Sequence, residues 1–226
     1  LRYGVEADGS FRLDRSIVWP MLRTVPNNTH GSLMRRFGWD IPRMITVNEA
    51  LLQQERVRRI VLDGTMTVES DWTAAKGTLS LTRILFPSVD AAAFCEKYIL
   101  KNTGKNPLYV EIPRARSVIR TEPAKGVEGS YELVAEICGD TALMLAPQAE
   151  VAFEAFFSGR KPAEQALALS ADAEYAKRRA LVAEWQRNLV LETPDPVIDA
   201  MFAFAKIRAA ESIYDTKGGL MHGPGG

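Results

Sequence analysis

Short runs of alternating apolar and polar side chains dominate the first 157 residues of the sequence. A period of two places successive side chains on opposite faces, as in antiparallel strands with one buried face. About ten such strands, separated by short turns, are typical of two packed layers. We therefore predict a mainly β fold, with an antiparallel two-layer sandwich over residues 1–157. The clearest runs are residues 11–19, 60–62, 65–68, 79–85, 94–100, 108–112, 131–137 and 151–157.

Turn residues indicate how neighbouring strands connect. Asp-Gly pairs favour the tight turns of hairpins. A loop rich in Asn, Gly and Pro reverses the chain over a longer stretch. Three hairpins are predicted: residues 3–5 with 11–19 across Asp8-Gly9, 60–62 with 65–68 across Asp63-Gly64, and 94–100 with 108–112 across the turn 102–107.

Residues 158–193 differ from the sandwich region because they are rich in alanine and charge. Within them, residues 171–188 read as a helix that Ser170 can cap. Glu174 and Arg178 stand one turn apart, which favours an ion pair along the helix. This stretch is therefore predicted to be a linker that contains one helix.

A second helix is predicted over residues 195–214. It follows the sequence Thr-Pro-Asp-Pro at 193–196, which combines a capping residue, early prolines and an acid at the positive end of the helix dipole. Apolar side chains occupy most of its circumference, so neighbours must surround it. The sandwich and helix 171–188 can each cover one side, and the rest of the sequence offers no further cover.

The last residues, 217–226, form a glycine-rich stretch that follows this helix directly. A helix that lacks partners and then ends in a loop is unusual for a complete domain. We therefore expect residues 194–226 to be the incomplete start of a helical domain in a truncated chain. A short flexible tail is the alternative.

Composition removes several classes of function. The 226 residues carry 28 Lys and Arg against 28 Asp and Glu, whereas domains that bind nucleic acid usually carry a basic excess. No apolar run reaches the length of about eighteen residues that a membrane span needs. Only two histidines occur, which excludes a multi-histidine metal site, and the motifs HExxH and CxxC are missing. We expect no nucleic acid, membrane, metal or cofactor, which leaves carboxylates as candidate catalytic groups.

The two cysteines, Cys95 and Cys138, both lie in alternating apolar stretches. Each is expected to be a buried free thiol. A disulfide between them would require their strands to be neighbours, which the sequence alone does not decide.

Residues 35–40 combine aromatic and charged side chains. An exposed Trp39 beside Asp40 could stack on the apolar face of a sugar while its polar neighbours bind hydroxyl groups. Trp39 and Asp40 are therefore candidate substrate-binding residues. The alternative is that Trp39 closes the edge of the sandwich.

Several stretches together resemble one family. Residues 77–88 and 98–110 resemble the sandwich domain that precedes the catalytic barrel in six-hairpin glycosidases, relatives of trehalases, rhamnosidases and glycogen-debranching glucosidases. Residues 191–196, 203–206 and 218–224 are similar to the start of such a barrel, an (α/α) toroid of six helical hairpins. The resemblance covers nearly the whole chain through the order of strands, linker and helix.

The resemblance implies a role for each segment. Helix 195–214 would be the first helix of the barrel, and helix 171–188 would join the two domains. The glycine-rich stretch would lie at the mouth of the barrel, where such enzymes bind sugar. His222 could then donate a hydrogen bond to a hydroxyl group, or else bond to nearby backbone. The candidate substrate-binding residues there are Gly218, Gly219, Met221 and His222.

The activity implied is hydrolysis of glycosidic bonds by two carboxylic acids. No position here matches those acids, so no catalytic residue is assigned, and the partners expected are a carbohydrate substrate and the remaining barrel of the same protein. Two alternatives stay open: a non-catalytic sandwich that binds glycans through Trp39, Trp72 or nearby loops, and a phosphorylase that uses phosphate in place of water. The compartment is undecided, with a periplasmic or secreted location favoured over the cytoplasm.

Overall fold

A computed structural model describes residues 1–26, 31–74, 76–139, 141–216 and 219–222. Strands account for most of its regular structure, and two α-helices lie between β14 and β15 within the described residues. The strands are β1 Arg2–Val5, β2 Phe11–Arg23, β3 Ser32–Phe37, β4 Thr46–Val47, β5 Ala50–Leu51, β6 Gln54–Leu62, β7 Met66–Ala74, β8 Gly77–Pro87, β9 Ala93–Asn102, β10 Leu108–Ile112, β11 Ala115–Arg120, β12 Glu132–Cys138, β13 Thr141–Leu145, β14 Glu150–Arg160, β15 Ile213–Thr216 and β16 Gly219–His222. The helices are α1 Ala171–Arg187 and α2 Pro196–Ala210, with short 3-10 turns η1 Ile41–Met44 and η2 Pro123–Lys125.

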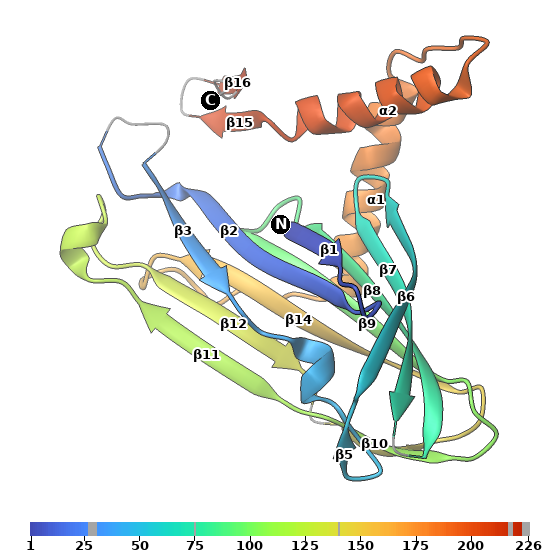
Figure 1. The fold of residues 1–226 in the computed structure, drawn as a ribbon. Coiled ribbons are helices and arrows are strands. Elements are labelled where there is room, and N and C mark those ends of the chain that lie inside the picture. The colour runs from blue at the N-terminus through green and yellow to red at the C-terminus, as the bar shows by residue number, and fades with distance from the viewer. Residues whose placement is uncertain (27–30, 75, 140, 217–218, 223–226) are drawn as a thin grey trace.

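One large antiparallel sheet forms the first layer, with strand order β11-β12-β14-β9-β8-β7-β6. The second layer consists of a three-stranded sheet, β1-β2-β3, and a four-stranded sheet, β13-β10-β4-β5. Figure 1 shows β2 and β3 lying across the large sheet. The core between the layers joins Trp19 and Phe37 to Tyr98 and Phe157, so each layer contributes alternate side chains. The predicted mainly β sandwich followed by helices is confirmed.

Two of the three predicted hairpins are confirmed by their register. β1 pairs with β2, with Val5 opposite Phe11, and β6 pairs with β7, with Leu62 opposite Met66. The glycine of each turn has a positive φ, +86° at Gly9 and +92° at Gly64. These positions favour glycine because a β-carbon is strained there.

The third predicted hairpin is wrong. β10 does not pair with β9 but with β13 and β4 in the other layer. The buried Asn102 explains the change of layer, because its side-chain amide donates to the carbonyls of Asn106 and Leu145, each at 2.9 Å. The loop after β9 therefore carries the chain across the core instead of folding it back.

The last strand of the sandwich extends beyond the predicted boundary at residue 157. β14 continues to Arg160, whose guanidinium contacts Glu132 on the neighbouring strand β12. Arg120 on β11 contacts the same carboxylate at 3.2 Å. These charged pairs hold the edge of the large sheet together.

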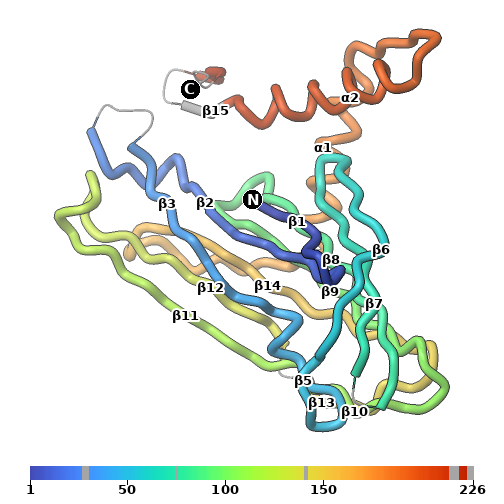
Figure 2. The backbone as a smooth tube through the Cα atoms, viewed as in Figure 1, coloured from blue at the N-terminus to red at the C-terminus, as the bar shows by residue number. Residues whose placement is uncertain are grey.

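The predicted helix 171–188 is confirmed as α1, which packs on the outer face of the large sheet (Figure 2). Its expected internal contacts differ. Ser170 makes no side-chain capping bond, and Glu174 contacts Ser88 and Lys177 in place of Arg178. The reason is that α1 is docked, so Glu174 reaches Ser88 beside the sheet and Arg178 reaches the turn between β6 and β7.

Arg178 is the main link between α1 and its neighbours. Its Nε donates to the carbonyl oxygen of Gly64 at 2.9 Å, in the turn between β6 and β7. Its Nη2 contacts Glu211, just after α2, at 2.5 Å. A second pair, Arg179 with Asp63 at 2.7 Å, fixes the same turn. One face of α1 is therefore tied to the sheet and to the end of α2.

α2 lies beyond one end of the sandwich (Figure 1), and within it only Ile207 is buried. Asp195 caps it, because its carboxylate accepts a hydrogen bond from the Val197 amide at 2.9 Å. The Nζ of Lys206 lies within 3.1 Å of four backbone carbonyls at the end of α1 and just after it. That ammonium group joins the two helices, since the last carbonyls of a helix lack intrahelical partners.

The end of α2 and the residues after it differ from the prediction. The helix stops at Ala210, not at residue 214, and the hairpin β15–β16 follows. Residues 219–222, predicted as loop, form the strand β16. The sequence predicts a longer helix because Ile213 continues its apolar pattern. An isoleucine at this position fits a strand equally well.

The cysteines separate into one buried and one exposed thiol. Cys95 is buried beneath α1, whereas Cys138, at the end of β12, is exposed, which corrects the expectation that it is buried. Ile137 points into the core, so the alternation of the strand turns Cys138 outward. Both are free thiols, and no disulfide joins them.

This difference predicts selective labelling by a thiol reagent. Burial, aided by the nearby carboxylate of Glu174, raises the pKa of Cys95 to about 12, so little reactive thiolate forms. We expect one thiol per folded chain to react at pH 8 and two after denaturation, measured by absorbance of the released leaving group. The Cys138→Ser variant should show almost no rapid reaction, and rapid labelling of that variant would contradict the burial of Cys95.

No described helix is long and apolar enough to cross a membrane.

Candidate functional site

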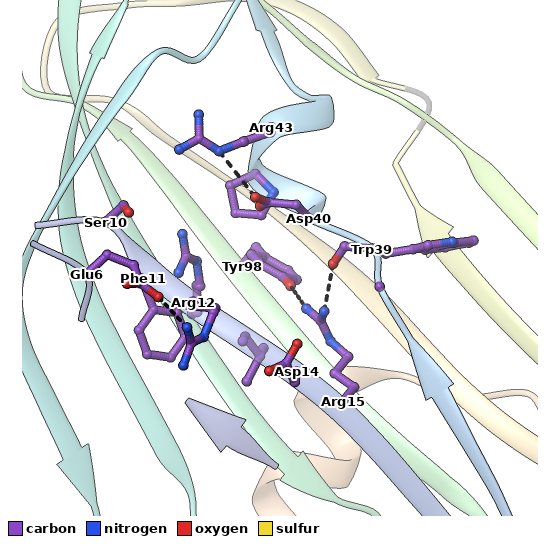
Figure 3. A pocket seen from close by; sticks show the side chains of 14 residues that line it. Glu6, Ser10, Phe11, Arg12, Asp14, Arg15, Trp39, Asp40, Arg43 and Tyr98 are labelled. Carbon is purple, nitrogen blue, oxygen red and sulfur yellow. Dashed lines mark hydrogen bonds and ion pairs between the residues drawn. The ribbon is translucent and has the colours of Figure 1, made fainter. Parts of the chain in front are cut away.

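A pocket of about 330 Å³ lies in the sandwich beside the start of β2 (Figure 3). β2 forms one wall, the segment from the end of β3 through η1 forms another, and β8 and β9 contribute the floor. Its wall is unusually rich in charge for a region next to the core. The charged lining residues are Glu6, Arg12, Asp14, Arg15, Asp40, Arg43 and Arg83.

Arg15 is held in a buried network below the pocket. Its side chain is 3 % exposed and that of its partner Glu96 is 0 % exposed. The guanidinium makes two contacts with the carboxylate, through Nε and through Nη2 at 2.9 Å, and Nη1 donates to the Trp39 carbonyl at 2.6 Å. The Tyr98 hydroxyl donates to the same carboxylate. Burial and the adjacent Glu96 raise the pKa of Tyr98 well above 10, so its hydroxyl keeps the proton that it donates.

Arg83 forms a second buried pair beside the first. Its Nη2 contacts the carboxylate of Glu55 at 2.6 Å, and the other oxygen of Glu55 accepts from the Phe11 amide at 3.0 Å. The guanidinium also lies 5.1 Å from the centre of the Phe11 ring and 5.8 Å from that of Trp72. Its buried Nε has no hydrogen-bond partner among the described residues. This orphaned donor stands out, because leaving a buried donor unpaired is costly.

The mouth of the pocket carries exposed ion pairs. Arg12 contacts Glu6 at 2.7 Å, and Arg43 contacts Asp40 at 3.2 Å. Both pairs are open to solvent, so each contributes little to stability. Their main effect is to place hydrogen-bond donors and acceptors around the opening.

The two predicted sugar-stacking residues take different parts in this pocket. Asp40 lies at the mouth, but the indole of Trp39 points away from the pocket (Figure 3). That ring is half-buried and packs edge-on against Phe157, 6.1 Å between centres. Trp39 contributes its carbonyl to the site, and its ring supports the core.

Trp72 cannot stack on a glycan, which corrects its place in the binding alternative. Its side chain is 1 % exposed and its Nε1 donates to Ser70 at 3.1 Å. On β7 it occupies an inward-facing position of the alternating pattern.

The predicted residues at the end of the chain form a separate group. Gly219, Met221 and His222 lie on β16, with His222 opposite Ile213 on β15. Gly219 has a φ of +105°, and Met221 and His222 are exposed. Gly218 lies outside the described residues. The structure therefore brings Met221 and His222 together on one hairpin but does not bring them to Trp39 and Asp40 (Figure 1).

No family model matches this chain, and no curated protein matches it either.

Sequence reasoning missed the buried pairs, although a signal was present. Arg83 is in phase with Leu79, Leu81 and Leu85, so it occupies an inward position of β8. Glu96 is likewise in phase with Tyr98 on β9. A charge at an inward position is rare unless it is paired, and such a position could have been singled out.

The described residues contain no cluster of three or more metal-ligating side chains. The pocket instead offers guanidinium groups that each pair with a carboxylate, together with the carboxylate of Asp14. These groups can donate or accept hydrogen bonds.

Proposed function

We propose that this chain is the N-terminal part of a glycoside hydrolase, with its two catalytic carboxylic acids outside these residues. One observation carries the proposal: α2 is apolar on most sides, yet most of its large apolar side chains are exposed. Val197 is 63 % and Met201 66 % exposed. A helix of this kind fits the interior of a helical domain, where neighbours cover all its faces.

The docking of α1 supports the proposal. Ion pairs and buried contacts tie α1 to the large sheet, and Lys206 and Arg178 then join α1 to α2 and the residues after it. The sandwich thus serves as a platform that orients a helical domain.

The carboxylates near α2 have structural roles in this proposal. Asp195 caps the helix, and Asp199 accepts a hydrogen bond from the Thr193 amide at 3.0 Å. Glu211 pairs with Arg178 and with Arg208. Hydrolysis would use one acid to protonate the leaving oxygen and another to activate water, or to attack the sugar in the retaining version.

A second candidate is a sandwich that binds carbohydrate without cleaving it. The pocket beside β2 favours this candidate, because it places hydrogen-bond donors and acceptors beside apolar side chains. Small-ligand sites are concave and combine apolar surface with polar groups that fix the orientation of the ligand.

The test is an assay of the protein expressed from the complete reading frame that contains these residues. We expect it to release sugar from oligosaccharides without phosphate, measured by chromatography of the products. Release that depends on phosphate would indicate a phosphorylase instead. Binding on a glycan array with no cleavage of any bound glycan would contradict the hydrolase and favour the second candidate.

A further inference from the structure

We propose that the pocket beside β2 binds one uncharged, hydroxyl-rich ring of the size of a single sugar residue. The inference deepens the second candidate function and rests on its carbohydrate partner, but not on any hydrolytic activity. It follows from the size of the pocket, its balance of charge and two hydrogen-bonding groups that lack partners.

The size of the pocket limits the ligand to a small one. Its volume of about 330 Å³ lies at the lower end of the range for small-molecule sites, roughly 300–1,000 Å³. One ring with its substituents fits this space, and a longer chain would have to leave through the mouth. Phe11, Leu13 and Pro42 provide apolar surface, which suits the C–H face of such a ring.

The charges of the pocket favour a neutral ligand. Each arginine of the wall already has its own carboxylate: Arg12 with Glu6, Arg15 with Glu96, Arg43 with Asp40, and Arg83 with Glu55. An anion would have to break one of these pairs or face a carboxylate of its own sign, and the exposed Asp14 is the carboxylate of the wall that a cation could meet without breaking a pair. A hydroxyl group can bond to a paired charge without displacing its partner, since each carboxylate oxygen has two lone pairs.

Two groups of the wall remain without a partner, one acceptor and one donor. The Asp14 carboxylate forms no side-chain hydrogen bond or ion pair among the described residues. The Nε of Arg83, whose side chain is 4 % exposed, is a buried donor without an acceptor. A hydroxyl group of a ligand can donate directly to the exposed Asp14 carboxylate, whereas the Arg83 Nε has almost no accessible surface, so a ligand oxygen reaches it only where the side chains of the wall move apart.

A zwitterion such as a free amino acid is the main competing ligand, because it also presents both charges. It would gain only by exchanging existing ion pairs for new ones, and the buried pairs of Arg15 and Arg83 would resist this exchange. The unpaired Asp14 could attract its ammonium, but its carboxylate would meet guanidinium groups that already have partners. The polyol is therefore favoured.

The experiment is titration of the full 226-residue chain with single-ring probes, followed by saturation-transfer NMR and calorimetry. The probes are the methyl glycosides of glucose, mannose, galactose and rhamnose, with alanine and inorganic phosphate for comparison. The variants are Asp14→Asn and Arg12→Ala, both at exposed positions, so folding should be retained. Arg116→Ala is the matched control, because Arg116 is 55 % exposed and pairs with Glu136 on the edge of the large sheet.

We expect at least one glycoside to bind, and Asp14→Asn and Arg12→Ala each to weaken that binding roughly tenfold, as for the loss of a hydrogen bond to a charged group. Arg116→Ala should bind like the parent chain. Binding of alanine or phosphate but no glycoside would overturn the ligand class. Equal binding by all variants would overturn the site, and no binding of any glycoside at millimolar concentration would overturn both.

The outcomes separate this inference from the hydrolase. If the 226-residue chain binds no glycoside, the hydrolase proposal is not affected, because that proposal is tested by sugar release from the complete protein. Conversely, a pocket that binds a glycoside as expected stands even where the complete protein cleaves nothing.

Discussion

Replacing Arg15 with alanine should lower the free energy of unfolding by about 3–5 kcal/mol. The change removes the cation from a fully buried pair and leaves the Glu96 carboxylate, 0 % exposed, without its counter-charge. It also removes the donor to the Trp39 carbonyl, which holds the segment after β3 against the core. Denaturation in urea, followed by tryptophan fluorescence, measures the loss.

Two further variants separate the effect of the unpaired Glu96 charge from the effect of losing the Arg15 side chain. The double variant Arg15→Met with Glu96→Leu removes both charges and should recover much of the stability, because the cost lies in the uncompensated carboxylate. Arg116→Ala, at an exposed pair, should change stability by no more than about 0.5 kcal/mol. A loss below about 1 kcal/mol for Arg15→Ala would contradict the buried network.

A Gly64→Ala variant should be destabilised by about 2–5 kcal/mol, because two costs combine. Gly64 has a φ of +92°, which strains any residue with a β-carbon. A β-carbon there would also lie only 2.5 Å from Cγ2 of Val182 on α1. Either α1 must move away from the turn or the turn must change shape, and both weaken the hydrogen bond from Arg178.

Amide hydrogen exchange and urea denaturation together test this expectation. Exchange should increase in α1 and in the turn between β6 and β7 more than in β9 or β14. Gly129→Ala is the matched control, because Gly129 has a φ of +90° but open space around its Cβ position. It should show the cost of backbone strain alone, about 1–2 kcal/mol. Equal losses for the two variants would mean that the contact with α1 adds nothing.

Local signals in the sequence account for the parts of the fold that were predicted. Asp8-Gly9 and Asp63-Gly64 define their hairpins because the turn and both strands lie within a few residues of one another. The strand β10 was misplaced because its partners β13 and β4 are distant in sequence. Choosing between two suitable partners depends on packing across the core, which a local pattern does not contain.

In the candidate site, too, local sequence patterns indicate some residues, whereas contacts between distant residues do not follow from the sequence. Asp40, which lines the pocket, is a candidate from the sequence because aromatic and charged residues stand together near it. The pairs Arg15–Glu96 and Arg83–Glu55 join strands that lie 81 and 28 residues apart. Their inward positions were visible, but their partners depend on the order of strands in the sheet. The partner of each buried charge could therefore be identified only from the structure.

The contact of Lys206 with the end of α1 has a geometric consequence. A single ammonium group holds carbonyl oxygens of Trp185, Gln186, Asn188 and Leu189 and thereby fixes the bend between the two helices. Because α1 is itself attached to the sheet, the axis of α2 is set by the sandwich and not by its own apolar surface. The β layers therefore determine the orientation, relative to the sandwich, of any domain that packs around α2.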